Sequence, residues 1–553
     1  MRGASQLAPN PEPLRAIDLF CGAGGLSEGL RLAGVKIVYA LDKDKDSIDT
    51  YRRNHPDTTA DCLSITDLTP DDIAQKAGGK VDIIVGGPSC QTFSTAGRKN
   101  GWVRKGDPRN DLWKQMLAVV KRLQPRAFLL ENVPGMLYWK QGEFGGVVLD
   151  EFAKLGYTVV KDIRLAADYG VPQRRRRLFL VGLRGTEGYQ FPAETHLGGW
   201  RRDTLDLWEN KRVERGLLKH IRTWEAIGDL PPAGVTERIV ERDRLTPFAK
   251  HLADDQPLRD HDLVPIPVDH LQLITHIPQG GTWRDIPGHL LPDRYRGMRR
   301  TDSTNLLGRL DPTLPAYTIT TQFNNVTTGC FTHPYADRAL TVREAARLQT
   351  FRDCYVFEGA TASRCRQVGN AVPPLLAHVL VAGIAKALLG DGAQKLHPAP
   401  KPVAPAATLP APPAGDAKTR ARMRKQKKRD TRPEMLLRQE LHARGLRFRV
   451  DHKPLSDLRR RVDVAFPGPK VAVLVHGCFW HGCPEHSRDT KSNTKWWKQK
   501  IDANKARDAD TVTNLETAGW HVIVVWEHEA PRQAADRLEP VVRQRQQPRS
   551  KAA

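Results

Sequence analysis

Short apolar runs alternate with helical stretches through residues 15–183, and this alternation limits the possible folds more than any other feature of the sequence. The runs cover residues 16–20, 36–42, 81–87, 127–133 and 177–183, and turn residues bound each of them. Strands that alternate with helices form doubly wound, mostly parallel sheets. We therefore predict an α/β domain whose ligand sites lie at the carboxyl ends of its strands.

The rest of the chain has a different character. Residues 186–335 are rich in Pro, Arg, His and Trp without a sustained period, which predicts a second, irregular domain, and residues 336–390 return to helix and turn. The apolar stretch 375–389 contains His378 and Lys386 and is too short to span a bilayer, so we expect a core helix. The Pro/Ala-rich residues 397–417 predict a semi-extended linker. A compact α/β unit is expected after it.

The formal net charge of +23 favours a polyanionic partner such as DNA or RNA, although a basic surface without a specific role would show the same excess. Residues 418–553 hold 31 Lys/Arg against 16 Asp/Glu, so most of the excess lies there. The 8 Cys are scattered, and residues 1–14 are polar and do not resemble a signal peptide. We therefore expect a reduced cytoplasm, where free thiols can act as nucleophiles or ligands.

A glycine-rich turn, residues 18–25, follows the first apolar run. Glycine allows a sharp turn and a close approach to a ligand, and a doubly wound sheet holds its cofactor at this point, but many such turns are only tight turns. Asp42 ends the second run and could accept hydrogen bonds from ribose hydroxyls, or could simply be exposed.

Cys90 lies in a loop, residues 86–94, directly after the third run. A free thiol is mostly protonated near neutral pH, so a nucleophilic role requires a lowered pKa or a base, whereas an isolated Cys after a strand is more often buried and inert. Glu131 ends the fourth run and could donate a proton. Residues 173–177, QRRRR, could bind phosphate or an anionic intermediate, or could form a solvated face.

Six segments together resemble the DNA cytosine-5 methyltransferase family in order and spacing over about residues 15–390. They are DLFCGAGGLSEGL, GGPSCQTFS, ENV, QRRRR, LTVREAARLQTF and QVGNAVPP. The resemblance implies a Rossmann-like α/β fold that uses S-adenosylmethionine, with residues 186–335 as the target-recognition domain. Ser89 and Thr92 depart from the residues common beside the nucleophile and could alter the stiffness of the loop.

The resemblance also implies roles for individual residues. Cys90 would attack carbon 6 of a flipped cytosine, and Glu131 would hold and protonate ring nitrogen 3. Carbon 5 is a poor nucleophile until this addition makes it enamine-like, and a duplex hides it until the base is extruded. Arg175 and Arg177 fit the Q-x-R-x-R pattern, and the second would steady the cytosine. The residues implied at the cofactor are Asp18, Phe20, Gly22, Gly24, Gly25, Leu26, Asp42, Asp61, Pro88, Asn370 and Val372.

The C-terminal part contains a candidate zinc site made of Cys478, Cys483, His486 and His528. Two thiolates and two imidazoles form a closed tetrahedral site, the arrangement of a structural metal. Buried thiols beside solvent-facing histidines would give the same pattern.

Acidic and histidine side chains surround this candidate zinc site: Asp463, Glu434, His476 and His481. Such a set could hold magnesium and activate water for phosphodiester hydrolysis. The neighbouring aromatic residues, Phe479 and Trp480, are candidates for wedging between base pairs, although such residues are more often core.

Residues 419–530 resemble the very-short-patch repair endonucleases through TRPE, GLRFRV, RVDVAF, HGCFWHGCPEH, WWKQKIDANKARD and GWHVIVVWEHE. The resemblance implies a restriction-endonuclease-like α/β domain that nicks DNA beside a T·G mismatch, the lesion left by deamination of 5-methylcytosine. The implied roles are magnesium binding by Asp463, acid–base assistance by His481, support by Glu434, Asn504 and Asp508, and intercalation by Phe479, Trp480 and Trp497. Val462, Val475 and His528 depart from residues found in some members.

We thus expect six segments. They are a disordered N-terminus (1–14), a catalytic domain (15–185 and 336–390), a target-recognition domain (186–335), a linker (391–417), a nuclease domain (418–535) and a basic tail (536–553). The expected partner is double-stranded DNA, with mismatch-repair proteins as further candidates and no membrane. We expect a monomer in the bacterial cytoplasm, associated with the nucleoid. Two alternatives stay open: a restriction–modification fusion that cuts unmethylated DNA, and a methyltransferase whose C-terminal domain only binds DNA.

Overall fold

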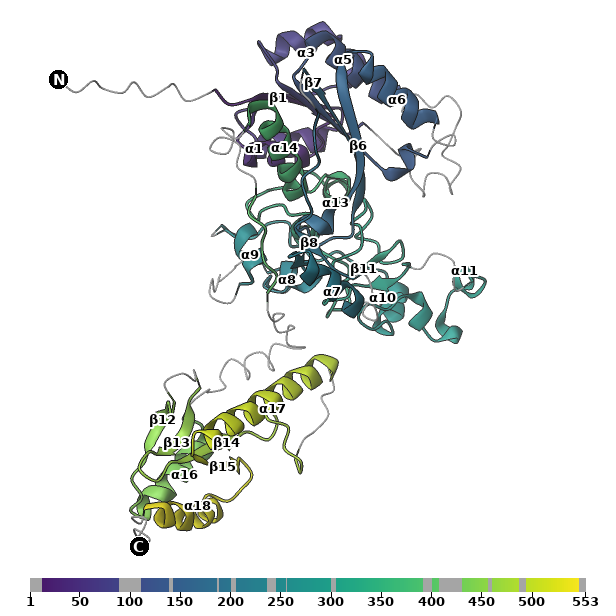
Figure 1. The fold of residues 1–553 in the computed structure, drawn as a ribbon. Helices are drawn as coiled ribbons and strands as arrows, with labels where there is room; N and C mark the ends of the chain where they lie inside the picture. Colours follow the sequence, from purple (N-terminus) through teal and green to yellow (C-terminus); the bar gives the residue numbers. More distant parts are fainter. Residues whose placement is uncertain are drawn as a thin grey trace, which may run out of the picture. The chain divides into compact units, whose positions relative to one another are not determined.

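The computed structural model describes residues 12–88, 111–138, 143–185, 188–199, 205–235, 245–254, 256–299, 305–390, 400–406, 430–455, 460–486 and 494–546. The chain divides into two compact units, Met1–Ala411 and Pro412–Ala553 (Figure 1). The division falls within the expected linker. Leu14 is buried in the core of the first unit, so the segment expected to be disordered stops short of it.

A seven-stranded sheet organises the first unit, in the order β3-β2-β1-β4-β5-β7-β6. The strands are β1 (Arg15–Leu19), β2 (Lys36–Asp42), β3 (Thr59–Cys62), β4 (Ile83–Gly86), β5 (Ala127–Asn132), β6 (Tyr157–Leu165) and β7 (Arg176–Arg184). The five predicted runs correspond to β1, β2, β4, β5 and β7. The first five strands of the order pair in parallel, whereas β7 is antiparallel to both β5 and β6, so the sheet is mixed.

Helices cover both faces of this sheet (Figure 1). On one face, α1 (Gly25–Leu32) and α14 (Pro374–Leu389) pack into a core with β1, β4 and β5. On the other face lie α3 (Pro70–Ala77), α5 (Leu112–Leu123) and α6 (Glu143–Ala153). Residues 361–389 are long and apolar enough to cross a membrane, but 72% of the apolar 18-residue stretch within them is buried, as expected for a core helix. The helix α2 (Lys45–Asn54) follows β2 and packs near it.

Short elements fill most of the remaining part of the first unit, in agreement with the predicted irregular domain. They are β8 (His196–Leu197), α7 (Leu205–Glu214), β9 (Leu218–Lys219), α8 (Thr223–Ile227), α9 (Pro247–Leu252), α10 (Val268–Thr275), α11 (Asp293–Arg296), β10 (Gly308–Arg309) and β11 (Cys330–Thr332). Of these, α8, α9 and β11 share a core with α12 (Val342–Leu348) and α13 (Thr361–Asn370), whereas α10 and α11 belong to a smaller core within residues 273–339. The fully buried Arg347 of α12 joins the irregular region to residues 336–390, because it pairs with Asp229 at 2.9 Å and with Asp353 at 2.6 Å.

Five 3-10 turns complete the described part of the first unit. They cover Ile65–Asp67, Pro134–Met136, Ala166–Tyr169, Trp283–Asp285 and Gly288–Leu290. The turn Ala166–Tyr169 lies between β6 and β7, and Ala166 and Tyr169 are buried in the core that also contains α14.

The second unit is built on a four-stranded sheet, β12 (Arg449–His452), β13 (Val462–Phe466), β14 (Val471–His476) and β15 (His521–Trp526), in that order. Only β14 and β15 are parallel. The helices α16 (Arg432–Ala443) and α18 (Pro531–Gln546) pack on one face, and α17 (Thr494–Thr517) packs on the other. The predicted basic tail is therefore wrong up to residue 546, because α18 buries Leu538 and Val542 in the core.

Candidate active sites

The glycine-rich turn brings several of the predicted cofactor residues together. Gly22, at φ +52°, donates its N–H to Asp42 Oδ2 at 2.9 Å, and a Cβ added there would meet nothing within 4 Å. A Cβ on Gly24, at φ +88°, would lie 2.7 Å from Tyr355 Oη. A Cβ on Gly25 would collide with the carbonyl oxygen of Val372. The turn therefore fits against residues far along the chain and leaves open space at Gly22, where a ligand can approach the backbone.

Asp18 lies beneath this turn and is completely buried. Its Oδ2 accepts a 2.7 Å hydrogen bond from Ser27, whereas Oδ1 has no hydrogen-bond partner among the described residues. Burial raises the pKa of Asp18 to about 7. A buried carboxyl with an unused oxygen is a site for a hydrogen-bond donor or a cation.

The other predicted cofactor residues are placed as follows. Phe20 is half-buried at φ +60°, and Leu26 packs in the sheet core. Asp61 lies one residue before the end of β3, where Lys76 at 2.7 Å and Tyr39 at 3.0 Å hold its carboxylate. Burial opposes the charge, but these two partners keep the pKa of Asp61 below its ordinary value. Asn370 is exposed at the end of α13.

The end of β5 presents Glu131 beside Arg177, whose Nε lies 2.9 Å from Glu131 Oε1. Burial raises the pKa of Glu131, and the charges of Arg177 and Arg175 oppose this rise. The end of β4 is close, since a Cβ on Gly87 would lie 3.1 Å from Glu131 Oε2 and Asn132 Nδ2 donates to the Pro88 carbonyl at 3.3 Å. Cys90 follows two residues after Pro88 and, like Ser89 and Thr92, lies outside the described residues.

Arg175 donates to backbone carbonyls. Its guanidinium, 1% exposed, reaches Ile319 and Gly369 at 3.1 Å each and Asn370 at 3.4 Å. The buried Gln173 also binds the segment around Ile319. It is the first residue of QRRRR, but no separate role was predicted for it, although a polar side chain between two strands can indicate a structural hydrogen bond. Its Oε1 accepts from Ile319 N at 2.9 Å, and its Nε2 donates to Gln349 Oε1 at 2.9 Å.

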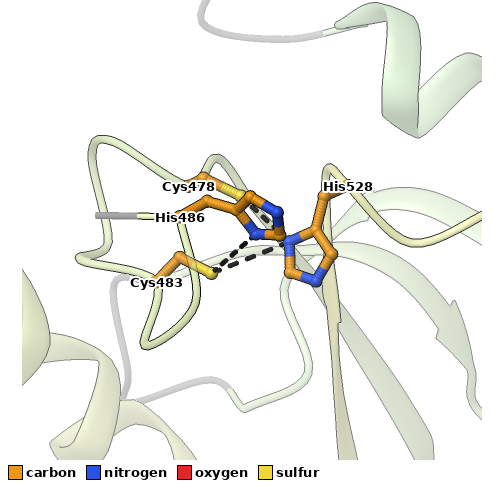
Figure 2. A group of neighbouring side chains, drawn as sticks. All are labelled: Cys478, Cys483, His486 and His528. Carbon is orange, nitrogen blue, oxygen red and sulfur yellow. Dashed lines mark hydrogen bonds between the residues drawn. The ribbon is translucent and has the colours of Figure 1, made fainter. Parts of the chain in front are cut away.

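The four predicted zinc ligands of the second unit gather in space, with their ligating atoms within 4.8 Å of one another (Figure 2). Cys478 Sγ lies 3.1 Å from His528 Nδ1, and Cys483 Sγ lies 3.7 Å from His528 Nδ1 and 3.8 Å from His486 Nδ1. Tetrahedral zinc with ordinary bond lengths places sulfur and nitrogen ligands about 3.6 Å apart. The group could therefore hold a metal ion, and its donor set fits zinc.

Asp463 lies on β13, and the backbone N–H of Val475 on the neighbouring β14 donates to its Oδ2 at 2.7 Å. Burial, and next the charge of Glu434, raises the pKa of Asp463 to about 6, although the Val475 N–H opposes this. Glu434 is buried at the start of α16 and pairs with Arg438 at 2.9 Å. Among the described residues, Asp463 belongs to neither group with metal-ligand geometry.

The second such group joins His476, His481 and Asp508. His481 Nδ1 lies 2.6 Å from Asp508 Oδ2, and the His476 ring stacks on the His481 ring at 4.1 Å between centroids. Because a carboxylate only accepts, Nδ1 of His481 carries the hydrogen, and Nε2 is left free to exchange a proton while the imidazole is neutral.

The three predicted intercalating aromatics form one cluster. The ring centroids of Phe479 and Trp497 are 4.9 Å apart, and those of Trp480 and Trp497 are 5.4 Å apart. All three are half-buried, so each keeps an exposed part. Asn504 on α17 braces the cluster by donating to the Trp480 carbonyl at 2.8 Å.

Comparisons with known proteins agree with this arrangement. Residues 14–386 match the model of C-5 cytosine-specific DNA methylases, and residues 415–487 match that of the DNA mismatch endonuclease Vsr. Type II methyltransferase M.AgeI of Thalassovita gelatinovora is 31% identical over 443 residues, covering 68% of this chain and 100% of the relative. Type II methyltransferase M.XorII of Xanthomonas oryzae is 35% identical over 396 residues, covering 67% and 84%.

A solved structure shows the same fold in the first unit. It is described as a prophage-encoded DNA modification methyltransferase of E. coli, and it has 25% identity, a TM-score of 0.51 and coverage of 68% of this chain and 99% of its own. The chain belongs to the C-5 cytosine-specific DNA methylase family and carries a Vsr endonuclease domain at its C-terminus.

Proposed function

We propose that the first unit methylates carbon 5 of a cytosine within a specific DNA sequence, with S-adenosylmethionine as the methyl donor. The Glu131–Arg177 pair carries this proposal, because it combines a largely buried carboxyl of raised pKa with a cation at the end of β5, beside the end of β4 that leads to Cys90. A carboxyl that holds its proton more firmly than usual can donate it to a ring nitrogen near neutral pH.

The chain's own residues prepare the cytosine. The Cys90 thiolate would form a bond to carbon 6, while protonated Glu131 gives a proton to ring nitrogen 3, so that carbon 5 gains electron density. Arg177 would hold the exocyclic carbonyl oxygen of the cytosine and the Glu131 carboxylate in place. After methylation, the carbon-5 proton leaves, ring nitrogen 3 returns its proton to Glu131, and the bond to Cys90 breaks, which restores the aromatic ring and the thiolate.

The cofactor site fits S-adenosylmethionine in three respects. The backbone at Gly22 is open to a ligand, Asp18 offers a buried oxygen without a partner among the described residues, and Asp42 stands at the strand end where ribose hydroxyls bind in such sheets. When bound, the cofactor would supply an electrophilic methyl group. Asn370 and Val372 would complete the pocket from the segment that follows α13.

We propose that Arg175 is a positioning residue and that Arg177 contacts the cytosine. Of the three carbonyls that bind Arg175, that of Ile319 belongs to the irregular region, and the other two belong to the end of α13. Arg175 would thus fix the target-recognition region, residues 186–335, against the catalytic sheet. That region would read base edges in the major groove while the target base is extruded.

For the second unit we propose magnesium-dependent nicking beside T·G mismatches. Asp463 would hold the magnesium ion with support from Glu434, and His481, oriented by Asp508, would move a proton for the attacking water. Zinc at the four-ligand group would brace the loop that carries Phe479 and Trp480, which would wedge between base pairs with Trp497.

Both activities on one chain would serve one purpose. Methylation at carbon 5 creates the deamination hazard, and the nuclease would start its repair at the same sites. We propose that the enzyme works as a monomer on nucleoid DNA in a bacterium, with mismatch-repair proteins downstream.

Two assays test the proposal. Cys90→Ala should eliminate methyl transfer while S-adenosylmethionine binding persists, and methylation that survives this substitution would reject Cys90 as the nucleophile. With magnesium, the protein should nick a T·G duplex and leave a matched duplex intact.

The second assay also weighs the restriction–modification alternative, which the Type II methyltransferase relatives favour. Double-strand cleavage of unmethylated matched DNA would establish that alternative. An absence of cleavage on both substrates would leave a domain that only binds DNA.

A further inference from the structure

The linker that leaves the first unit makes specific contacts with that unit. Its composition, rich in Pro and Ala, predicts no burial, yet the described part, residues 400–406, lies against the base of the irregular region. The Val403 side chain is half-buried and packs on the core that contains Trp224. Residues 404–406 also line a cavity of about 560 Å³, together with Trp208.

Two side chains from the irregular region bind the backbone of this segment. His196 Nε2 lies 3.0 Å from the carbonyl oxygen of Val403, and the guanidinium of Arg222 donates to the carbonyl oxygen of Ala406. Glu225, which is fully buried and paired with Arg222, holds this guanidinium in place. Backbone carbonyls on both sides of Pro405 thereby have donors, as in a docked peptide rather than a passing coil.

His196 is held in one tautomer for its contact with the Val403 carbonyl. His196 is completely buried, and its Nδ1 lies 2.8 Å from the Thr195 hydroxyl. A carbonyl oxygen only accepts, so Nε2 carries the hydrogen and Nδ1 accepts from Thr195. Its ring also lies against Gly170, where an added Cβ would be 2.9 Å from His196 Cε1. The ring therefore fills the space between the linker and the turn Ala166–Tyr169, which precedes the QRRRR segment.

We propose that residues 400–406 are an intramolecular ligand of the first unit, a strap that anchors the linker to the base of the target-recognition region through His196, Arg222 and Glu225. The tether to the nuclease unit then begins at residue 407 and not after Gly390 at the end of α14. Release of the strap would lengthen this tether from residues 407–429 to residues 391–429. Because effective concentration depends on tether length, the anchor sets how closely the second activity follows the first.

Hydrogen exchange of the full-length protein, resolved to single amides, tests the strap. In the wild type, the Ala406 amide should exchange at least about tenfold more slowly than in an unstructured peptide, because Arg222 and the packing of Val403 hold this backbone against the irregular region. Val403→Asp should remove this protection, since it places a charge against the core. Lys401→Asp, two residues earlier and exposed, is the matched control and should keep the protection.

A second variant separates the strap from a general loss of folding. His196→Phe retains an aromatic ring over Gly170 but removes the donor to Val403, so exchange at Ala406 should rise while core amides in β4 and β5 remain protected. An Ala406 amide that exchanges at the unstructured rate in the wild type would overturn the proposal. So would equal protection in the wild type and in Val403→Asp.

Discussion

Arg175 and Arg177 lie two residues apart, but replacing each by Met should affect different properties: stability for Arg175 and the methylation rate for Arg177. Arg175 is 1% exposed, and its loss leaves the buried carbonyls of Ile319 and Gly369 and the partly buried carbonyl of Asn370 without this donor. At about 1 kcal/mol or more for each unsatisfied group, Arg175→Met should lower the free energy of unfolding by about 3 kcal/mol. Arg177 instead pairs with a carboxyl in the candidate active site, so Arg177→Met should mainly lower kcat.

Thermal unfolding and single-turnover methylation of the full-length protein distinguish the two roles. Arg175→Met should lower the Tm of the first unit by about 5 °C. Arg177→Met should keep the Tm within about a degree and reduce the methylation rate at least about a hundredfold, which corresponds to about 2.7 kcal/mol of transition-state stabilisation. A wild-type Tm for Arg175→Met combined with a lost rate would refute the positioning role. Equal losses of Tm in both variants would refute the division of labour.

Three further predictions concern acid stability, the metal group and the nuclease. Burial lowers the pKa of both His55 and His196 from 6.5 to about 4. Unfolding therefore takes up protons between these two pKa values. The free energy of unfolding should fall by about 3 kcal/mol per histidine as the pH drops from 6.5 to 4, which denaturant titration can measure. A free energy of unfolding that stays constant over this range would contradict the assignment. Native mass spectrometry should count one zinc ion, and Cys483→Ser should lose it and lower the Tm of the second unit while methylation persists; a metal-free wild type would exclude the site. Asp463→Asn should abolish T·G nicking but retain DNA binding, whereas the exposed control Asp536→Asn should nick normally; nicking by Asp463→Asn would remove its assignment as the magnesium ligand.

The sequence predicts the strands that carry the sites better than it predicts the rest of the sheet. The runs that became β1, β2, β4 and β5 are buried on both faces and read as continuous apolar segments. The edge strand β6 was missed because most of its residues are only partly buried and it contains Lys161 and Asp162. The four-residue β3 has no apolar run, and the reversed direction of β7 depends on pairing that no local pattern records.

The candidate sites divide in the same way. Residues at strand ends, such as Glu131, and the clustered metal ligands could be identified because topology or local spacing brings them together. The burial of Arg175 could not, since its acceptors are 144 to 195 residues away in the chain. The strap was hidden for the same reason, because His196 is 207 residues from Val403.

The helix α18 was missed for a local reason. Pro540 and several arginines interrupt its apolar positions, so the segment resembles a basic tail in composition. The buried positions Ala534, Ala535, Leu538 and Val542 follow helical spacing only when they are read together with the sheet they cover.

The covalent step at Cys90 is the central claim, and trapping tests it most directly. In 5-fluorocytosine, fluorine replaces the hydrogen on carbon 5. A duplex with this base at the target position therefore has no carbon-5 proton to lose, so the bond from Cys90 to carbon 6 should persist after methyl transfer. With S-adenosylmethionine, the protein should form a denaturation-resistant adduct with this DNA, and Cys90→Ala should form none. Full methylation of ordinary cytosine without any adduct on the fluorinated duplex would contradict the account.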